Sequence, residues 1–259
     1  MAFRRLDTTA PFNSASSAKL LEFYESHLLD KITRRAAKPS HKTFAASSFR
    51  CDRRSWFRLR GVQPDRLDTP DITLDFAASL GTACHEIIQS NLKEFLGDDW
   101  IDVDSYLKSI DFPYQYEVKT SANGLETQVE IIDPPIRFSC DGIIRWEGEL
   151  WLLEIKTEEY SAWKSLTDSR PEHNDQTGLY ATLLKLNKIL FIYVDRWYGG
   201  MKSYSISMTE SQQKDIMARI CYVLDMVDKN IAPEGLSKGD KWCSPNYCPY
   251  HSKCKEYGR

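Results

Sequence analysis

Apolar positions in the first hundred residues recur at three- and four-residue steps, the period of an amphipathic helix. This pattern predicts three helices, over about residues 20–32, 48–61 and 72–97. Ser16 and Ser17 are candidate N-caps of the first helix, and Pro39 is expected to end it. Gly61 is expected to close the second helix, before a connection rich in Pro and Asp at about residues 62–70.

After Asp111 the pattern changes to alternating or continuous apolar runs, which are typical of strands. Strands are predicted over residues 114–120, 125–132, 136–146, 150–157, 188–198 and 202–208. Turns are expected at residues 147–149 and at Gly199-Gly200. Helical periodicity returns over residues 173–186 and again over 210–230, where Thr209 is the candidate N-cap.

This order of elements predicts an α/β protein with a central mixed β-sheet flanked by helices and a helical, cysteine-rich periphery. We expect one domain over residues 1–259, with its core at about 70–230, because the sequence contains no repeat, low-complexity tract or long linker. Helices in residues 1–69 and a tail of residues 231–259 would lie against this core.

Composition supports a folded protein, since 42% of the residues are hydrophobic and 12% are aromatic. No apolar run approaches the roughly 18–20 residues that cross a bilayer. The first residues carry basic side chains but no apolar signal segment, so we expect a cytoplasmic protein without a membrane partner. The seven cysteines are an odd number in a reducing compartment, and they therefore require an explanation other than a disulfide framework.

The net charge of −3 conceals an uneven distribution. Residues 1–70 contain 14 Lys and Arg against 7 Asp and Glu, which leaves the rest of the chain acidic. Contact with a polyanion would therefore fall on the first quarter of the chain, and an acidic site in the remainder. A solvated helix end that includes Arg34, Arg35, Lys38 and Lys42 is the simpler explanation of the basic excess.

Charged residues interrupt two of the most apolar segments. Asp141 follows an apolar run directly, and Glu154 and Lys156 lie two positions apart in the segment LLEIKT. Because strand side chains alternate, Glu154 and Lys156 would share one face while Ile155 points into the core on the other. Burying an unpaired charge costs several kcal/mol, so such groups are normally paired or bound to metal.

Phosphodiester hydrolysis is one use for this arrangement. Two carboxylates can hold Mg²⁺, and a neighbouring lysine can orient a water and offset charge on phosphate oxygens. A structural ion pair among Asp141, Glu154 and Lys156 is the alternative, and the spacing alone favours it. Three further residues occur in a suggestive order: His85 on the third predicted helix, then Gln176 and Tyr180, four apart on one face of a later helix.

Taken together, G-x-x-x-H (Gly81–His85), Asp141, E-x-K (Glu154–Lys156) and Q-x-x-x-Y (Gln176–Tyr180) resemble the RecB-type branch of the PD-(D/E)xK nuclease superfamily. Cys140 stands where the pattern has proline. The resemblance implies that His85, Asp141, Glu154 and the Ile155 carbonyl would ligate Mg²⁺ or Mn²⁺. Lys156 would be the catalytic lysine, and Gln176 and Tyr180 would position the substrate strand.

The cysteines extend the resemblance. Cys51 lies far upstream of Cys243, Cys248 and Cys254, and one early with three late cysteines is similar to the iron–sulfur nucleases of this branch, the AddB-type and CRISPR-adaptation nucleases. The resemblance implies a [4Fe–4S] cluster on these four thiolates, which suits Cys₄ ligation. Zinc on four cysteines, or on three with His251, remains the alternative. Cys84, Cys140 and Cys221 lie in apolar stretches and are expected to be core residues.

The basic segment beside Cys51 interleaves arginines with aromatic residues. Arginine–phosphate contacts and aromatic stacking would suit single-stranded nucleic acid or a frayed end, whereas buried aromatics with outward arginines are an equally good explanation. The candidate nucleic-acid contacts are Arg53, Arg54, Trp56, Arg58 and Arg60, with Phe57 among them.

These features predict a metal-dependent DNA exonuclease of phage or bacterial DNA processing, recombination or degradation. Its partner would be DNA that is single-stranded or has a free end. The chain contains no Walker A pattern, so a helicase or recombination partner would be a separate chain. A structure-specific endonuclease and a non-catalytic DNA-binding subunit with a structural metal are the alternatives.

Overall fold

A computed structural model describes residues 14–36, 42–65, 71–121, 124–237 and 239–257. The side chains of residues 14–17, the predicted stop at Pro39 and the end of the 62–70 connection lie outside the described residues. No helix in the part that is described is long and apolar enough to cross a membrane.

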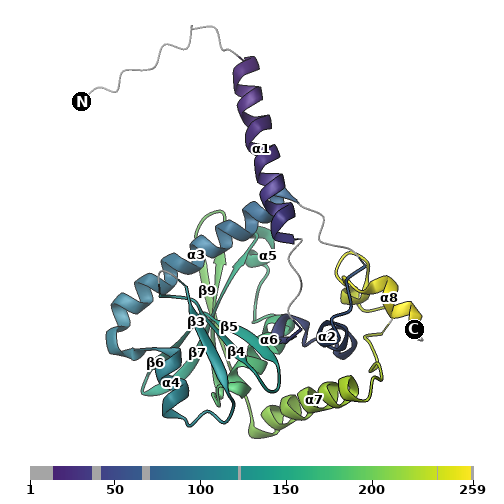
Figure 1. The fold of residues 1–259 in the computed structure, drawn as a ribbon. Helices are drawn as coiled ribbons and strands as arrows, with labels where there is room; N and C mark the ends of the chain where they lie inside the picture. Colours follow the sequence, from purple (N-terminus) through teal and green to yellow (C-terminus); the bar gives the residue numbers. More distant parts are fainter. Residues whose placement is uncertain (1–13, 37–41, 66–70, 122–123, 238, 258–259) are drawn as a thin grey trace.

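The strands form two mixed sheets (Figure 1). The first sheet has the order β1-β5-β4-β3, in which only β1 and β5 run parallel. The second has the order β2-β6-β7-β8-β9, in which only β7 and β8 run parallel. The strands are β1 Phe44–Ala45, β2 Trp100–Ile101, β3 Tyr116–Thr120, β4 Thr127–Ile131, β5 Ile136–Cys140, β6 Gly142–Trp146, β7 Glu149–Glu158, β8 Lys188–Asp195 and β9 Met201–Ser207.

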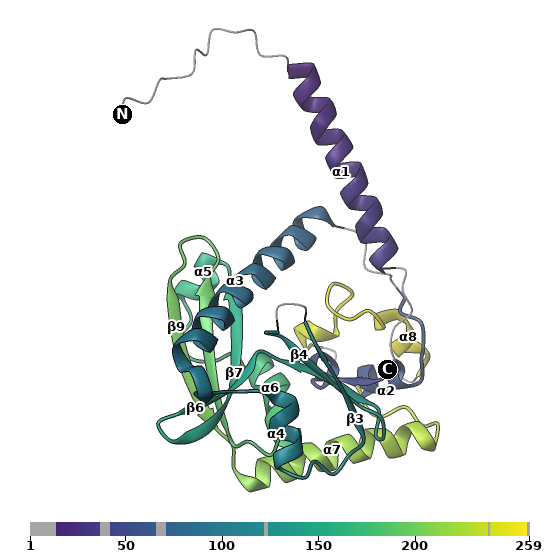
Figure 2. The ribbon, with the colours of Figure 1, turned by 60° about the vertical axis from the view of Figure 1, so that its left-hand side comes forward.

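Helices surround these sheets (Figures 1 and 2). They are α1 Ser14–Ala36, α2 Asp52–Leu59, α3 Ile72–Leu96, α4 Val103–Ser109, α5 Tyr160–Lys164, α6 Pro171–Leu183, α7 Glu210–Asp228 and α8 His251–Glu256. Short 3₁₀ turns cover Ala46–Ser48, Gly97–Asp99 and Lys241–Cys243. The predicted α/β class is confirmed, but the strands are divided between two sheets where one was expected.

The division occurs at Asp141. The apolar run 136–146 was predicted as one strand, yet β5 ends at Cys140 in the first sheet and β6 begins at Gly142 in the second. Gly142 lies against the indole of Trp100, which a β-carbon would approach to 2.8 Å. Glycine therefore allows the chain to cross between the sheets at this point, and Asp141 lies at the crossing.

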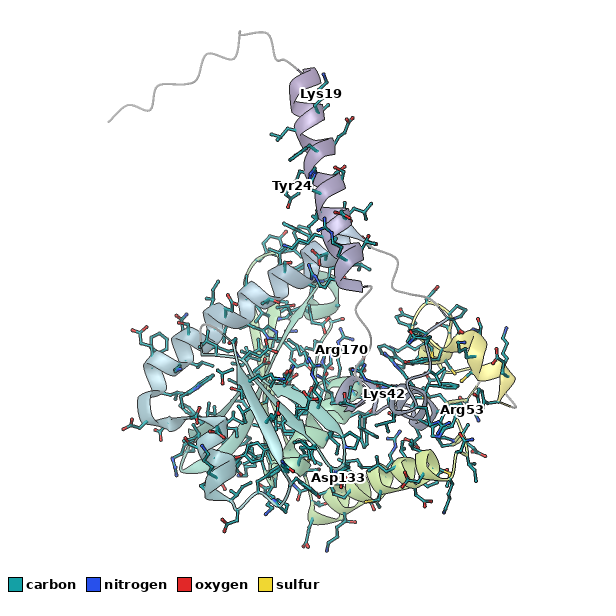
Figure 3. All side chains as sticks on the ribbon, in the orientation of Figure 1. Lys19, Tyr24, Lys42, Arg53, Asp133 and Arg170 are labelled. Carbon is teal, nitrogen blue, oxygen red and sulfur yellow. The ribbon has the colours of Figure 1, made fainter. Side chains whose placement is uncertain are left out.

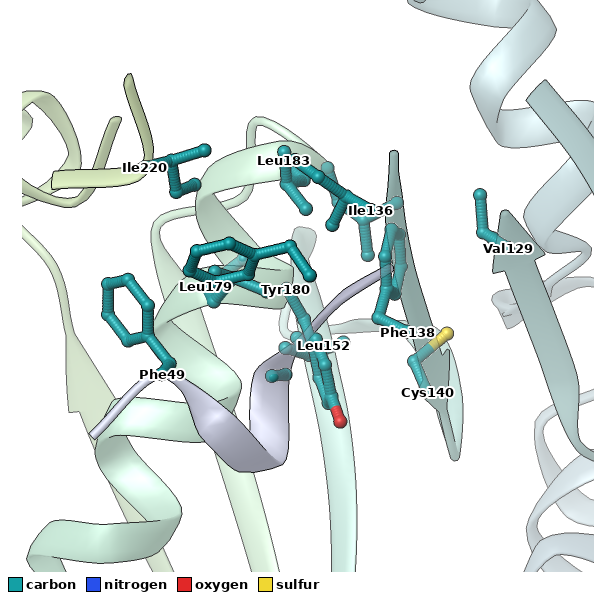
Figure 4. Close-up of a cluster of buried hydrophobic side chains, with 14 of the residues drawn as sticks. Phe49, Val129, Ile136, Phe138, Cys140, Leu152, Leu179, Tyr180, Leu183 and Ile220 are labelled. Atoms are coloured by element: carbon teal, nitrogen blue, oxygen red, sulfur yellow. The ribbon is translucent and has the colours of Figure 1, made fainter. Parts of the chain in front are cut away.

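Two apolar clusters cover the two faces of β7. On one face, Ile155 and Leu153 pack under α3 with Ile88, and on the other Leu152 belongs to the main core with α6. Figure 4 shows part of this main core, where Leu183 of α6 lies next to Ile136 of β5. The alternation predicted for β7 is therefore confirmed, because successive side chains of this strand enter different layers.

The first helix extends away from the rest of the protein (Figures 1 and 2). Its apolar residues Leu20, Phe23 and Tyr24 are 69%, 60% and 56% exposed, and Figure 3 shows Tyr24 on the projecting part. An ion pair of 3.0 Å between Arg35 and Asp75 of α3 connects its base to the body. The helical period was predicted correctly for this segment, but it did not indicate whether anything covers the apolar face.

Candidate active site

Asp141 lies where the chain passes from β5 to β6, and both of its carboxylate oxygens have partners. Oδ2 accepts a 2.6 Å hydrogen bond from the backbone N–H of Ile155 on β7, and Oδ1 lies 3.2 Å from Nδ1 of His85 on α3. Gln89, one turn after His85, donates to the Asp141 carbonyl at 2.7 Å. The side chain is thereby fixed between a helix and a strand distant in sequence.

Glu154 and Lys156 lie side by side on β7, as the strand period predicted. The Glu154 carboxylate is 3% exposed and lies 2.6 Å from the Lys156 ammonium, while Ile155 between them is fully buried on the other face. Burial raises the pKa of Glu154 to about 7, with a further contribution from the charge of Asp141, and the charge of Lys156 opposes this shift. A second positive charge beside the two carboxylates would therefore be strongly favoured.

His85 projects from α3 toward the same carboxylates. Burial lowers the pKa of His85, but the hydrogen bond and the charge of Asp141 outweigh this effect, so the net shift is upward. Gly81, one turn earlier, allows α3 to approach β7, because a β-carbon there would lie 3.1 Å from the Thr157 hydroxyl. The G-x-x-x-H spacing thus corresponds to a close helix–strand contact followed by an imidazole on the same helix face.

Helix α6 supplies the fourth side of the site. The side-chain oxygen of Gln176 accepts from Lys156 at 3.3 Å, and its amide nitrogen donates to the Tyr180 hydroxyl at 2.6 Å. Tyr180 is 4% exposed, and its ring stacks on Phe138 at 5.3 Å (Figure 4). Burial raises the pKa of Tyr180, so its hydroxyl stays protonated and available as a donor.

These side chains line one cleft of about 450 Å³. The structure therefore brings together His85, Asp141, Glu154, Lys156, Gln176 and Tyr180. Within the part of the chain that is described, no three His, Cys, Asp or Glu side chains already have the arrangement of a metal site. The carboxylates here bind His85, a backbone N–H and Lys156, so a bound metal ion would have to exchange with at least one of these partners.

Sequence reasoning missed several polar residues of this cleft, among them Gln89 and Arg196. Gln89 follows His85 by four positions on the same helix face, and this spacing could have identified it. Arg196, at the turn after β8, also lines the cleft, but nothing in its local sequence indicates so.

The four predicted cluster cysteines line a second cavity of about 200 Å³. Cys51 precedes α2, Cys243 ends a 3₁₀ turn, Cys248 follows it and Cys254 lies on α8, and all four are buried. Burial raises the pKa of Cys248. His251, the alternative fourth ligand, is not among the residues that line this cavity.

The remaining three cysteines differ from one another. Cys140 is buried as expected, Cys84 is half-buried and Cys221 is exposed. The prediction of a core position for Cys221 is therefore wrong. Cys221 lies on α7, where an apolar residue next to the buried stripe need not belong to it.

The basic helix α2 requires a correction to the predicted nucleic-acid contacts. Arg53 is 7% exposed and donates to the Pro233 carbonyl at 2.6 Å, and the indole of Trp56 is buried and donates to the Met226 carbonyl at 3.1 Å. Arg58 is half-buried and donates to the Thr43 carbonyl. Arg54 lines the cysteine cavity, and Arg60 is exposed beside the Trp56 ring. Arg53 and Trp56 therefore connect α2 to residues 226–233 and are not accessible to a bound nucleic-acid strand.

No protein-family model matches the chain, and no curated protein matches it in sequence. Among solved structures, the chain is similar to SSO0001, with 16% identity, coverage of 91% of this chain and 98% of that one, and a TM-score of 0.47. It is also similar to the alkaline exonuclease LHK-Exo of Laribacter hongkongensis, at 14% identity and a TM-score of 0.41. This similarity covers 74% of this chain and 90% of LHK-Exo. The complex of LHK-Exo with dAMP gives 13% identity, the same coverage and a TM-score of 0.42.

Proposed function

We propose that this protein is a metal-dependent nuclease that hydrolyses phosphodiester bonds in DNA. The observation that carries the proposal is the convergence of His85, Asp141, Glu154 and Lys156 from α3, the β5–β6 crossing and β7 into one cleft. A simple ion pair would not require a second buried carboxylate beside the first. Nor would it require the hydrogen bond between the His85 imidazole and the Asp141 carboxylate.

The donor set fits a hard divalent cation. Two carboxylates and an imidazole face the same cleft, and their mutual repulsion and burial favour an added positive charge. His85, Asp141, Glu154 and the Ile155 carbonyl would hold Mg²⁺ or Mn²⁺. When bound, the ion would polarise the scissile phosphate and acidify a water.

Lys156 has the position needed to act on the attacking water or on phosphate charge. Its ammonium lies between the Glu154 carboxylate and the Gln176 amide oxygen, so two acceptors orient it toward the cleft. Fixed donors aimed at developing charge are the largest single contribution in many active sites. Gln176 and Tyr180 hold this lysine through a continuous chain of hydrogen bonds and would position the substrate strand.

Degradation of end-labelled DNA with Mn²⁺ tests the proposal. We expect wild type to degrade the DNA. Asp141→Asn and Lys156→Ala should each lose at least about 100-fold in rate, in line with the loss of one electrostatic contact to the transition state. Asp98→Asn, an exposed acidic residue near the end of α3, is the matched control and should keep wild-type activity. Equal degradation by wild type and Asp141→Asn would overturn the assignment of this site, and no degradation by wild type would favour the non-catalytic DNA-binding subunit.

Within this proposal an exonuclease is the first choice and a structure-specific endonuclease the second. A covalently closed single-stranded circle separates them, because only an endonuclease can cut it. The biological setting we propose is phage or bacterial DNA processing, recombination or degradation, in the cytoplasm and with a separate helicase or recombination partner.

We also propose that Cys51, Cys243, Cys248 and Cys254 hold a [4Fe–4S] cluster, with a zinc ion as the alternative occupant. This proposal is supported by the four buried cysteines, which lie far apart in sequence and line a single cavity. Such a cluster would be anionic, and Arg54 lies on the wall of the same cavity.

Anaerobic purification tests the cluster. We expect a brown protein with absorbance at about 400 nm and stoichiometric iron and sulfide. Cys248→Ala should lose the iron, whereas Cys221→Ala, which changes an exposed cysteine, should retain it. Stoichiometric zinc without iron would contradict the cluster and support the zinc alternative.

A further inference from the structure

A buried carboxylate fixes the backbone of the turn between β8 and β9. Asp195, the last residue of β8, is 1% exposed, and its carboxylate accepts the backbone N–H groups of Trp197 at 2.9 Å and Tyr198 at 3.2 Å. Gly199 completes the turn at φ +71°. The buried carboxylate thus fixes the backbone of two residues whose side chains remain 73% and 79% exposed.

Helix α5 adds a third ring to this surface. The Tyr160 ring meets the Tyr198 ring edge-on at 5.1 Å, and it stacks on Trp163 at 6.3 Å. Trp163 is itself anchored, because its indole donates to the Tyr193 carbonyl and lies directly against Gly200. We call Tyr160, Trp197 and Tyr198 the aromatic platform. Figure 2 shows α5 beside β9, at the same end of the molecule.

Arg196 connects the aromatic platform to the acidic cleft. It directly precedes Trp197, lines the cleft that contains Glu154 and Lys156, and donates its backbone N–H to the Glu158 carbonyl. Its side-chain Nε is buried and makes no hydrogen bond to any residue that the structure describes. The nearby Glu158 carboxylate instead accepts two hydrogen bonds from Arg170, from Nε at 2.7 Å and from Nη2 at 3.2 Å. A guanidinium with an unused donor at the edge of a cleft is suited to a phosphate.

We infer that Arg196 and the aromatic platform bind a single-stranded segment of nucleic acid next to the acidic cleft. This inference rests on the proposed function. Arg196 would take a backbone phosphate, and Trp197 and Tyr198 would stack on unpaired bases. Bases within a duplex have both faces covered, so exposed rings gain stacking energy only from single strands or a terminal pair.

The charge around the platform favours nucleic acid over an apolar protein segment. Lys164 lies 5.8 Å from the Tyr160 ring centre, so positive groups border the rings on two sides together with Arg196. Three exposed rings with Lys164 and Arg196 beside them match the combination of aromatic and basic residues that single-strand binding proteins use. A protein partner would gain its affinity mainly from apolar area and would not use the unpaired Nε of Arg196.

Binding to fluorescein-labelled oligo(dT) and to a blunt duplex, in EDTA to prevent cleavage, tests the inference. The double variant Trp197→Ala/Tyr198→Ala should bind oligo(dT) about 10- to 100-fold more weakly, with little change for the duplex. Arg196→Met should weaken binding and reduce the dependence on salt by about one phosphate contact. Trp146→Ala, an exposed tryptophan of the β6–β7 hairpin, is the control and should bind as wild type.

The outcomes separate this inference from the proposed function. If the double variant binds oligo(dT) as tightly as Trp146→Ala does, the platform is refuted, and a protein partner becomes the better explanation of the exposed rings. If wild type binds oligo(dT) through the platform but cuts no DNA in Mn²⁺, the proposed nuclease fails while the binding site stands. Both substituted residues are more than 70% exposed, so a change in thermal stability is not expected.

Discussion

Two charged side chains in the middle of β7 dominate the chemistry at the scale of single residues. Glu154 is almost fully buried, and its charge is tolerated there because the Lys156 ammonium lies 2.6 Å from its carboxylate. Burial of such a pair rarely adds net stability, since the desolvation of both charges offsets their attraction. The pair is therefore a poor source of stability, which agrees with the functional role proposed for it.

Adjacent arginines on α2 are expected to have opposite roles. Arg53→Met should lower the free energy of unfolding by about 2–3 kcal/mol, because it leaves the buried Pro233 carbonyl without its donor. Arg54→Met should change stability by no more than about 0.5 kcal/mol. Urea unfolding of both variants checks this. A larger loss for Arg54→Met than for Arg53→Met would contradict the observed orientation of α2.

His173 makes the protein sensitive to acid. Burial is the main reason that the pKa of His173 falls to about 3, with the charges of Lys156 and Arg170 adding to the effect. The folded state therefore binds fewer protons than the unfolded state between about pH 3 and pH 6.5. Stability from this group is fully present above about pH 6.5 and is lost as the pH falls toward 3.

His173→Gln should remove this part of the acid dependence. Between pH 6.5 and 5, its free energy of unfolding should fall less steeply than that of wild type, by up to about 1.4 kcal/mol per pH unit. Urea titrations at several pH values measure the slope. His27→Gln, which changes an exposed histidine of α1, should keep the wild-type slope. Equal slopes for all three proteins would refute the role of His173.

Periodicity identified the residues of β7 but not those of α2. Strand alternation has only two faces, so placing Ile155 in the core determined where Glu154 and Lys156 point. On α2, several arginines surround Trp56 and Phe57, and a short helix has too few turns to define one polar face. Which arginine is buried depends on Pro233, more than 150 residues later, and this contact is invisible in the local sequence.

At the scale of elements, the position of α3 against β7 decides whether His85 reaches Asp141. Gly81 makes the close approach possible, since a β-carbon would lie only 3.1 Å from the Thr157 hydroxyl. Gly81→Val should move the helix outward and weaken the binding of Mn²⁺ by at least about 10-fold, with the loss of one ligand. Isothermal titration calorimetry measures this affinity.

Ala83→Val is the matched control for that substitution. Ala83 lies on the exposed face of the same helix, so Ala83→Val introduces the same β-branched residue into α3 without contacting β7. If the Gly81→Val variant binds Mn²⁺ as tightly as wild type, the spacing between α3 and β7 is unimportant for the site.

Long periodic elements were predictable and short ones were not. The helices α3 and α7 and the strands β7 and β8 carry enough residues to reveal a period, and Thr209 caps α7 as expected. The strands β1 and β2 have two residues each, and α5 has five, so no periodic signal exists for them. The break at Asp141 was missed because an apolar run looks the same whether its two halves enter one sheet or two.

At the scale of the whole molecule, two segments far apart in sequence, one around α2 and one from the end of α7 to α8, pack against each other. Trp56 of α2 bonds to the end of α7, Phe57 stacks on Tyr250, and Asp65 accepts two backbone N–H groups at the start of α8. These contacts surround the cavity that the four cysteines line. The family resemblance of the cysteines implied that these distant segments meet, whereas the separate contacts around the cavity could not be inferred.

Asp141 and Glu154 are proposed to share one metal ion, and Mn²⁺ binding followed by electron paramagnetic resonance tests this most directly. We expect wild type to bind Mn²⁺ in the cleft. Asp141→Asn and Glu154→Gln should each weaken that binding at least about 10-fold, and the exposed control Asp98→Asn should not. If both cleft variants bind Mn²⁺ as tightly as wild type, the two carboxylates do not share a metal, and the central claim is wrong.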